Sequence, residues 1–316
     1  MFRRFQLVLL SVLALVAAIA CRGHSLSGIV ALEQPASDCR IVQHALGQSC
    51  VPNHPQRVVV LDPGSLGNAF ALGIKPVGAA VLEGKFPTYL QDKSAGVTIV
   101  GTPNQPNLEA ILLLKPDLIL GDSRIRIYDQ LSRIAPTVLT ADWDEPEDEA
   151  LWKRDLKLHA LALGKTEVAE KLLQAYQQRT QALRTRLSDR PLPRISVTNF
   201  RRDQVRIYLN DSFSGTILQD VGLPRPSAQA QTGFVKRISL ETIPSLDGDA
   251  IFAVTSPANS SLFRQFQAHP LWFHLNAVKL ERVVDVSDEI WVNGWHILGA
   301  NLVLDDLFKF FLSKAS

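Results

Sequence analysis

Arginine side chains follow two apolar segments of this chain at the points where those segments end. Arg124 and Arg126 come after the run Asp117–Leu120, and Arg201 and Arg202 come directly after a second run. A guanidinium group is a planar, permanently charged donor that pairs well with carboxylate and other anionic oxygens. Open α/β sheets hold ligands at the carboxyl ends of their strands. The spacing therefore predicts a binding site with local positive charge. A solvated surface position is the alternative for Arg126 and for one residue of the Arg201–Arg202 pair.

Patterns for catalysis and for direct metal binding are weak. The segment 62–67, DPGSLG, lacks both G-x-G-x-x-G and a Lys-Ser/Thr ending, so we interpret it as a turn between a strand and a helix. The chain contains no G-x-S-x-G elbow, no H-E-x-x-H and no zinc-type Cys/His spacing. Its seven histidines are scattered, whereas a metal-ion carrier needs clustered His and carboxylates. We expect a binding protein and no enzyme, and keep a direct metal-ion carrier as an alternative.

Short apolar runs alternate with helical patterns in the first half of the chain. Such continuous runs are typical of parallel strands that are buried on both faces. In the stretch 100–121, Pro106 and Asn107 favour a helix start, and Pro116 ends that helix. The alternation predicts a helix-covered, mostly parallel sheet. The expected strands are 57–61, 76–79, 117–120 and 137–139, and the expected helices are 66–72, 108–114 and 127–134.

The middle of the chain predicts two longer helices. Apolar residues follow helical spacing from Trp152 to Gly164, and again over about 22 residues that end before Pro191, or ~33 Å of helix. Strands are then expected at 194–200, 205–209, 251–254 and 282–286, and helices at 213–221 and 296–312. With 316 residues, the chain is long enough for two lobes with separate cores. The predicted fold class is α/β, with two Rossmann-like lobes, 39–164 and 190–316, bridged by one long α-helix at 165–189.

Residues 1–20 have the pattern of a signal peptide. Arg3 and Arg4 precede an apolar run of sixteen residues, which is shorter than the ~20 residues of a membrane-spanning helix. The formal net charge of +2 comes from these two arginines, because residues 1–20 contain no acids. The mature chain is therefore neutral overall, and no basic field indicates nucleic acid as a partner.

Small residues stand immediately before Cys21, a pattern that resembles a bacterial lipobox. The match departs from the usual pattern at Ala18, where a larger apolar residue is typical. We expect lipidation of Cys21, with residues 21–38 as a polar tether to the membrane. The folded part would then lie at the periplasmic face of the inner membrane, or at the cell surface if the envelope has one membrane. Ordinary secretory cleavage is the alternative.

Cys39 and Cys50 flank a short segment that predicts a hairpin with its turn near Leu46-Gly47. Export to an oxidising compartment favours a disulfide between them, worth ~2–3 kcal/mol in the chain-entropy model for so short a loop. Free thiols, or metal ligation together with His44 and His54, remain alternatives.

Several blocks in order resemble the substrate-binding proteins of bacterial ABC importers for ferric siderophores, haem and cobalamin. The resemblance runs from about Cys39 to the C-terminus and is strongest with the ferric-dicitrate and ferric-hydroxamate branch. It implies a class III substrate-binding protein, with two Rossmann-like lobes joined by a rigid helix and a ligand in a shallow cleft. It also implies a monomer that delivers its ligand to an ABC permease and its ATPase, with haem or cobalamin as the alternative ligand. The blocks are HALGQSCVPNHPQRVVVLD, LGIKPVG, PNLEAILLLKPDLILG, YDQLSRIAPTV, LALGK, ISLETIPSLDGDAIF, PLWFHLNAVK and ANLVLDDLFKF.

The resemblance also implies which residues contact the ligand. A ferric siderophore brings its own oxygen ligands to iron, so the protein needs no metal site or cofactor of its own, only aromatics and cationic side chains. Related proteins carry contacts in the loop after 117–120, which favours Arg124, and hydroxamate binders carry an aromatic before the segment ISLE. The candidates are Arg124, Arg126, Arg201, Arg202, Phe234, Lys236, Arg237, Trp291 and Trp295.

Two of these positions follow the last predicted strand. Trp291 matches an aromatic position of a hydroxamate-binding relative, whereas Asn293 departs from that pattern. Packing under the final helix is the alternative for Trp295. The loop Thr102–Gln105 lacks the arginine of the hydroxamate branch, so the composition favours ferric citrate or a citrate-type siderophore.

Glu109 and Glu241 have a different implied role. In the resembling family each lobe presents a carboxylate to arginines of the permease, and these two glutamates match those positions. Each stands at a predicted helix start, where the helix dipole also favours a carboxylate, so simple capping is the alternative.

Overall fold

The computed structural model describes residues 39–141, 149–189, 191–255 and 260–312. The predicted signal peptide 1–20, the tether 21–38 and the lipidation site Cys21 lie outside the described residues. Among the helices within these ranges, none combines the length and the apolar content that a membrane crossing requires.

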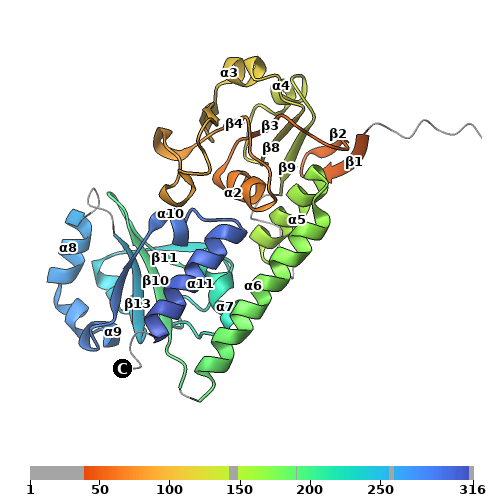
Figure 1. Cartoon of the computed structure of the whole chain (residues 1–316). Coiled ribbons are helices and arrows are strands. Elements are labelled where there is room, and N and C mark those ends of the chain that lie inside the picture. The colour runs from red at the N-terminus through yellow and green to blue at the C-terminus, as the bar shows by residue number, and fades with distance from the viewer. Residues whose placement is uncertain (1–38, 142–148, 190, 256–259, 313–316) are drawn as a thin grey trace, which may run out of the picture. The chain divides into compact units, whose positions relative to one another are not determined.

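The first lobe is built on a five-stranded parallel sheet in the order β5-β4-β3-β8-β9 (Figure 1). The continuous apolar strand β3 is buried along its whole length, as the sequence predicts. The strands are β3 (Val58–Val60), β4 (Gly78–Ala79), β5 (Thr98–Ile99), β8 (Leu118–Asp122) and β9 (Thr137–Thr140). The helices of this lobe are α2 (Pro63–Ala71), η1 (Leu82–Gly84), η2 (Thr88–Leu90), α3 (Leu108–Leu113) and α4 (Tyr128–Ser132). A small hairpin joins β6 (Gly101–Thr102) to β7 (Gln105–Pro106).

A hairpin of β1 (Cys39–His44) and β2 (Gly47–Pro52) precedes this sheet. A disulfide links Cys39 to Cys50 across the hairpin, in agreement with the expected pair. The hairpin is attached to β9 by hydrogen bonds, since the Ser49 hydroxyl donates to the Thr137 carbonyl at 2.8 Å and the Ala45 N–H to the Leu139 carbonyl at 3.0 Å.

The second lobe has a mixed five-stranded sheet in the order β12-β11-β10-β13-β14. Strands β10, β13 and β14 are parallel, and β11 and β12 pair antiparallel at one edge. The strands are β10 (Ile195–Phe200), β11 (Val205–Tyr208), β12 (Val235–Ile238), β13 (Ala250–Thr255) and β14 (Val283–Val286). The helices are α7 (Phe213–Val221), η3 (Leu240–Leu246), α8 (Ser260–Ala268), η5 (Pro270–His274), α9 (Asn276–Lys279), α10 (Asp288–Trp291) and α11 (Ile297–Leu312).

Two consecutive helices connect the sheets, as the sequence predicts. Helix α5 (Leu151–Leu163) ends at Gly164, whose left-handed φ of 66° suits glycine. Helix α6 (Thr166–Leu187) follows with 22 residues. It packs against α5, α7 and α11, and the Tyr176 hydroxyl donates to the Asp220 carboxylate of α7 at 2.8 Å.

The hydrophobic core is continuous from one lobe to the other. A single cluster of buried side chains contains Val58 and Val60 of the first sheet and Val197 and Phe252 of the second, with α5, α6 and α11 between them. Smaller clusters cover the other face of each sheet. One cluster of the core therefore extends through both lobes, because the connecting helices bury apolar side chains that pack against both sheets.

Candidate functional site

The candidate site lies where the central strands of the first sheet end. Asp62 follows β3 and Asp122 ends β8, and these two parallel strands are neighbours. The chain passes from β3 to β4 on one side and later to β8 on the other. This is the point at which the strand order reverses, and open α/β sheets bind ligands there.

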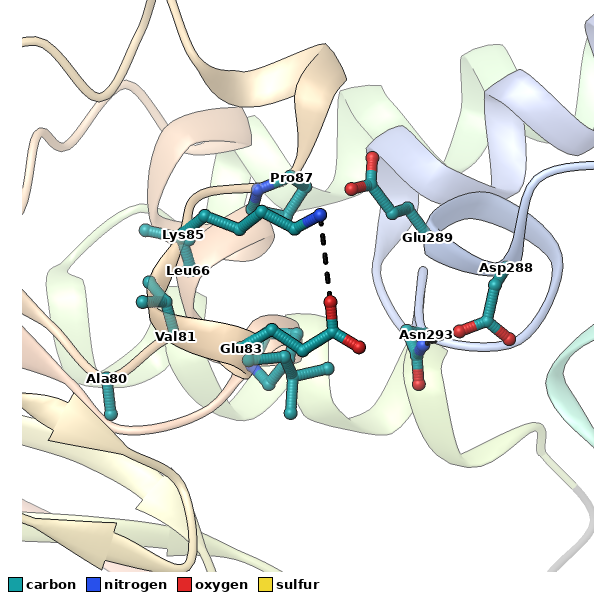
Figure 2. A pocket seen from close by; sticks show the side chains of 11 residues that line it. Leu66, Ala80, Val81, Glu83, Lys85, Pro87, Asp288, Glu289 and Asn293 are labelled. Carbon is teal, nitrogen blue, oxygen red and sulfur yellow. Dashed lines mark hydrogen bonds and ion pairs between the residues drawn. The ribbon is translucent and has the colours of Figure 1, made fainter. Parts of the chain in front are cut away.

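Two hollows form the cleft, and residues from both lobes line each of them. The larger, here called the Arg124 pocket, has a volume of about 240 Å³. The smaller, here called the Lys85 pocket, has about 80 Å³ and shares Pro63, Leu82 and Asn293 with the first. The remaining lining residues of the Arg124 pocket are Asp62, Gly64, Pro103, Asn104, Asp122, Arg124, Thr140, Asp155 and Trp295. Those of the Lys85 pocket are Leu66, Ala80, Val81, Glu83, Lys85, Pro87, Asp288 and Glu289 (Figure 2).

Arg124 is held at the mouth of its pocket by the carboxylate that ends β8. Its Nε donates to Asp122 Oδ1 at 3.1 Å and its Nη2 to Asp122 Oδ2 at 2.6 Å. The backbone N–H of Arg124 also donates to Asp122 Oδ1 at 3.0 Å. Half of the Arg124 side chain remains exposed. The guanidinium is thus fixed in direction by Asp122 and still reachable from the cleft.

An aromatic group from the second lobe also lines the Arg124 pocket. The ring of Trp295 lies 5.7 Å from that of Phe213 and 6.0 Å from that of Phe234, centroid to centroid, at tilted angles. Such packing fixes the indole, which presents an apolar surface to the pocket that it lines.

Asp62 is buried and caps helix α2. Its Oδ1 accepts from the Ser65 N–H at 2.9 Å and its Oδ2 from the Ser65 hydroxyl at 2.5 Å. Asn68 donates to His159 Nδ1 at 3.1 Å, which leaves the proton of the neutral ring on Nε2, facing Ser65 Oγ at 3.2 Å. Burial, and then the charge of Asp122, raise the pKa of Asp62 to about 6, because they outweigh the two hydrogen bonds from Ser65.

Asp155 brings a third carboxylate to the Arg124 pocket, from helix α5. Burial, followed by the negative charge of Asp62, raises its pKa well above the ordinary value. Among the described residues, none forms a hydrogen bond or an ion pair with this carboxylate. Asp155 therefore retains hydrogen-bonding capacity that faces the cleft.

The Lys85 pocket has an apolar floor and a charged rim. Glu83 and Lys85 form an ion pair of 3.6 Å from the first lobe, and Asp288 and Glu289 face them from the second (Figure 2). Asn199 and Asn293 donate to the two oxygens of Asp288 at 3.0 and 2.7 Å. Burial still raises the pKa of Asp288.

Charged residues that line the two hollows are mostly acidic. The cations are Lys85 and Arg124, whereas the acids are Asp62, Glu83, Asp122, Asp155, Asp288 and Glu289. Arg124 is the one predicted cation among the described lining residues of these two hollows.

Direct contacts hold the two lobes together beside the cleft. The Thr88 N–H donates to Glu289 Oε2 at 2.8 Å, and the Tyr89 hydroxyl lies 2.9 Å from His296 Nε2. Gly67 of α2 packs against the imidazole of His296 so closely that a Cβ at this position would collide with the ring. Within the described ranges, no group of three or more His, Cys, Asp or Glu is arranged to hold a metal ion.

A family model described as periplasmic binding protein matches residues 58–289, most of the folded chain. The chain belongs to the periplasmic binding protein family. The expected family and fold class are thus confirmed.

Two relatives are 37% identical to this chain. One is the probable siderophore-binding lipoprotein YfiY of Bacillus subtilis, over 301 residues that cover 89% of this chain and 90% of the relative. The other is the achromobactin-binding periplasmic protein of Dickeya dadantii, over 270 residues that cover 81% and 86%. Staphylococcus aureus SirA, in its crystal structure with staphyloferrin B, superimposes with a TM-score of 0.77 at 33% identity, covering 86% of this chain and 98% of SirA.

The structure of this periplasmic binding protein brings some of the predicted ligand residues together. Arg124 and Trp295 line the same pocket, and Phe234 contacts Trp295. Arg201 is exposed beside the cleft, where its charge acts on the carboxyl group of Asp288. The remaining predicted cations are exposed and lie outside the described lining of both hollows: Arg126, Arg202, Lys236 and Arg237.

The prediction that Trp291 contacts the ligand is wrong, because its side chain belongs to the core. It is fully buried, its ring stacks on that of Phe252 at 4.7 Å, and its Nε1 donates to Asp306 at 2.7 Å. The short helix α10 turns this indole inward and leaves Asn293 on the cleft side. Lys236 and Arg237, which are predicted as ligand contacts, lie on the edge strand β12.

The predicted docking glutamates are both exposed at helix starts. Glu109 lies in the first turn of α3, whose cap is Asn107. Glu241 lies in the first turn of η3 and accepts from the Ser239 hydroxyl at 2.5 Å, which lowers its pKa. Both placements are compatible with capping and with an external partner.

Proposed function

We propose that this protein binds a ferric siderophore outside the cytoplasm and delivers it to an ABC permease for iron uptake. Ferric citrate or a citrate-type or hydroxamate siderophore is the ligand class that fits best. The observation that carries the proposal is the Arg124 pocket, where a guanidinium from one lobe and an indole from the other line one hollow at the strand ends. Names of relatives support the ligand class, since they include an Fe(3+)-citrate-binding protein of Bacillus subtilis and the Fe(3+) dicitrate-binding protein FecB of Escherichia coli.

The chemistry required is recognition without bond making. Iron in a siderophore complex already has its oxygen ligands, so the protein addresses the outside of the complex. Arg124 would donate charge-assisted hydrogen bonds to exposed anionic oxygens, and Trp295 would cover the organic scaffold. Arg201, near Asp288 at the rim, adds a second cation along the entry path.

Delivery would use the outer surface of both lobes. Glu109 and Glu241 each present an exposed carboxylate that arginines of a permease would bind. In this proposal the mature chain is a monomer, is attached to the membrane by a lipid on Cys21, and works with the permease and its ATPase. Arg202, Lys236 and Arg237, exposed on the second lobe, remain proposed as ligand contacts at the rim.

A titration panel tests the proposed function. Mature protein is titrated with ferric citrate, a ferric hydroxamate, a ferric catecholate, haem and cobalamin, and separately with chelator-free Zn²⁺ and Mn²⁺. We expect ferric citrate to quench tryptophan fluorescence at micromolar concentration. The Trp295→Phe variant should lose much of the quenching and keep most of the affinity, because Trp295 lines the pocket, whereas the other tryptophans of the described residues, Trp152, Trp272 and Trp291, are buried. Binding of haem, of cobalamin or of a bare metal ion alone would overturn the assignment.

A further inference from the structure

We propose that an anionic ferric siderophore binds in the Arg124 pocket together with one proton from solvent, and that the carboxylate of Asp155 receives this proton. The inference rests on the proposed function, because it concerns the same ligand in the same pocket. In this proposal, Asp155 determines how the affinity of the pocket depends on the charge of the complex and on pH.

The three carboxylates of the pocket differ in their hydrogen-bond partners. Asp62 is engaged by the N–H and the hydroxyl of Ser65. Asp122 is engaged by Arg124 through both of its oxygens. Asp155 lines the same hollow without a hydrogen bond to any described residue. It is the carboxyl group of this set that is left to interact with a ligand.

Charged groups of both signs surround Asp155. From its own helix it faces Arg154, and His159 lies one turn further on. From the ends of β3 and β8 it faces Asp62, Asp122 and Arg124. The second lobe contributes the uncharged Asn293 and Trp295 to the pocket. Burial keeps His159 neutral, since it lowers the pKa of that ring to about 3.

These surroundings make an ionised Asp155 unfavourable for an anionic ligand. The Arg124 charge is already shared with Asp122, so a further anion would meet the negative charge of an ionised Asp155 beside the carboxyl group of Asp62. Like charges that come together in a partly buried site raise the pKa of the weaker acid until it binds a proton. Once protonated, the Asp155 hydroxyl can donate to an anionic oxygen of the complex, and repulsion becomes a hydrogen bond.

Burial already favours the protonated form before ligand arrives, because it raises the pKa of Asp155. A bound anion raises that pKa further. Affinity should therefore be highest at low pH and fall as the pH rises through the titration of Asp155, with a slope approaching about tenfold per pH unit. The Asp155→Asn variant imitates the neutral acid in shape and should bind without this dependence.

The experiment measures ferric citrate binding by titration calorimetry from about pH 5.5 to about pH 8.5, in pairs of buffers that differ in ionisation enthalpy. Wild-type protein, Asp155→Asn and the control Asp129→Asn are compared. Asp129 is an exposed carboxylate of α4 in the same lobe, outside the pocket lining. All three proteins meet the same ferric citrate species at each pH, so differences between their profiles report the protein.

We expect the wild type and Asp129→Asn to take up close to one proton per ligand at the upper end of the range and to lose affinity there. Asp155→Asn should take up far less and bind more tightly than the wild type at high pH. Parallel affinity profiles for wild type and Asp155→Asn would overturn the inference. Wild-type binding that takes up no proton in any buffer would overturn it even if the variant does not fold. Absence of binding of any ferric complex at any pH would overturn the proposed function, and this inference with it.

Discussion

His296 Nε2 donates to the Tyr89 hydroxyl at 2.9 Å and so joins the residue just before helix α11 of one lobe to η2 of the other. The direction follows from the other ring nitrogen, because Nδ1 accepts from the Gly299 N–H at 3.1 Å and a neutral imidazole then carries its proton on Nε2. Tyr89 in turn lies 3.5 Å from the Glu289 carbonyl. A buried polar chain thus crosses the boundary beside the cleft.

Protonation of the buried histidines should destabilise the protein in acid. Burial lowers the pKa of His159 and His296 to about 3, so the native state binds fewer protons than the unfolded state between that value and 6.5. Their contribution to stability is complete well above pH 6.5 and falls as the pH drops, with a slope that approaches about 1.4 kcal/mol per pH unit for each histidine. Asp62, with its pKa raised to about 6, changes in the opposite direction below that pH.

The free energy of unfolding, measured with urea at about pH 6.5 and about pH 5.5, gives this loss of stability in acid. The His296→Gln variant should lose about 1 kcal/mol less than the wild type over that unit, because the unfolded-state imidazole is only half protonated at the upper pH. Equal losses in the two proteins would contradict a neutral, buried His296.

Gly67→Ala should weaken the contact between the lobes. A methyl group there would collide with the His296 ring, and overpacking of this kind costs ~1–3 kcal/mol. Urea unfolding of Gly67→Ala, His296→Ala and the double variant forms a thermodynamic cycle. The double variant should be more stable than the sum of the two single losses predicts, because the smaller side chain leaves room for the methyl group. Additive losses would show that the two positions are not in contact.

Arg124→Ala and Arg126→Ala should differ in ligand affinity although they remove the same charge two residues apart. Arg124 lines the pocket, whereas Arg126 is exposed outside its lining. Loss of a charge-assisted hydrogen bond, ~1.5–3 kcal/mol, should raise the Kd for ferric citrate by roughly tenfold to a hundredfold. Arg126→Ala should stay close to wild type in fluorescence titrations. A similar loss in both variants would indicate a general field effect and no direct contact by Arg124.

Glu109→Ala combined with Glu241→Ala should separate binding from delivery. Both carboxylates are exposed and lie outside the described lining of the cleft, so affinity for the ferric complex should not change. Iron uptake by cells that depend on this protein should fall. Normal uptake by the double variant would leave only the capping role for these glutamates.

The order of strands and helices could be predicted because the local patterns agree with the global fold. Val58–Val60 is a continuous apolar run and is a fully buried central strand. Asn107 and Gly164 cap helices where the sequence places them. Edge strand β12 was missed, since its exposed Val235, Lys236 and Arg237 show no strand pattern.

The cleft was harder to predict because a position in the sequence does not give the direction of a side chain. Trp291 and Trp295 both follow the last strand, yet one stacks in the core and the other lines the pocket. Asp155 has the ordinary spacing of a polar residue on an amphipathic helix, and it faces the cleft only because α5 packs against α2. Asp62 stands in a predicted turn before the helix expected at 66–72, whereas the structure begins α2 at Pro63 and makes Asp62 its N-cap.

The continuous core has a consequence for how this molecule comes apart. Buried side chains of both sheets and of helix α6 belong to one cluster. Separation of the two lobes would therefore expose apolar surface on each of them. Heating should therefore melt the described chain as a single cooperative unit, and a cut between α5 and α6 should yield fragments that fold only when mixed.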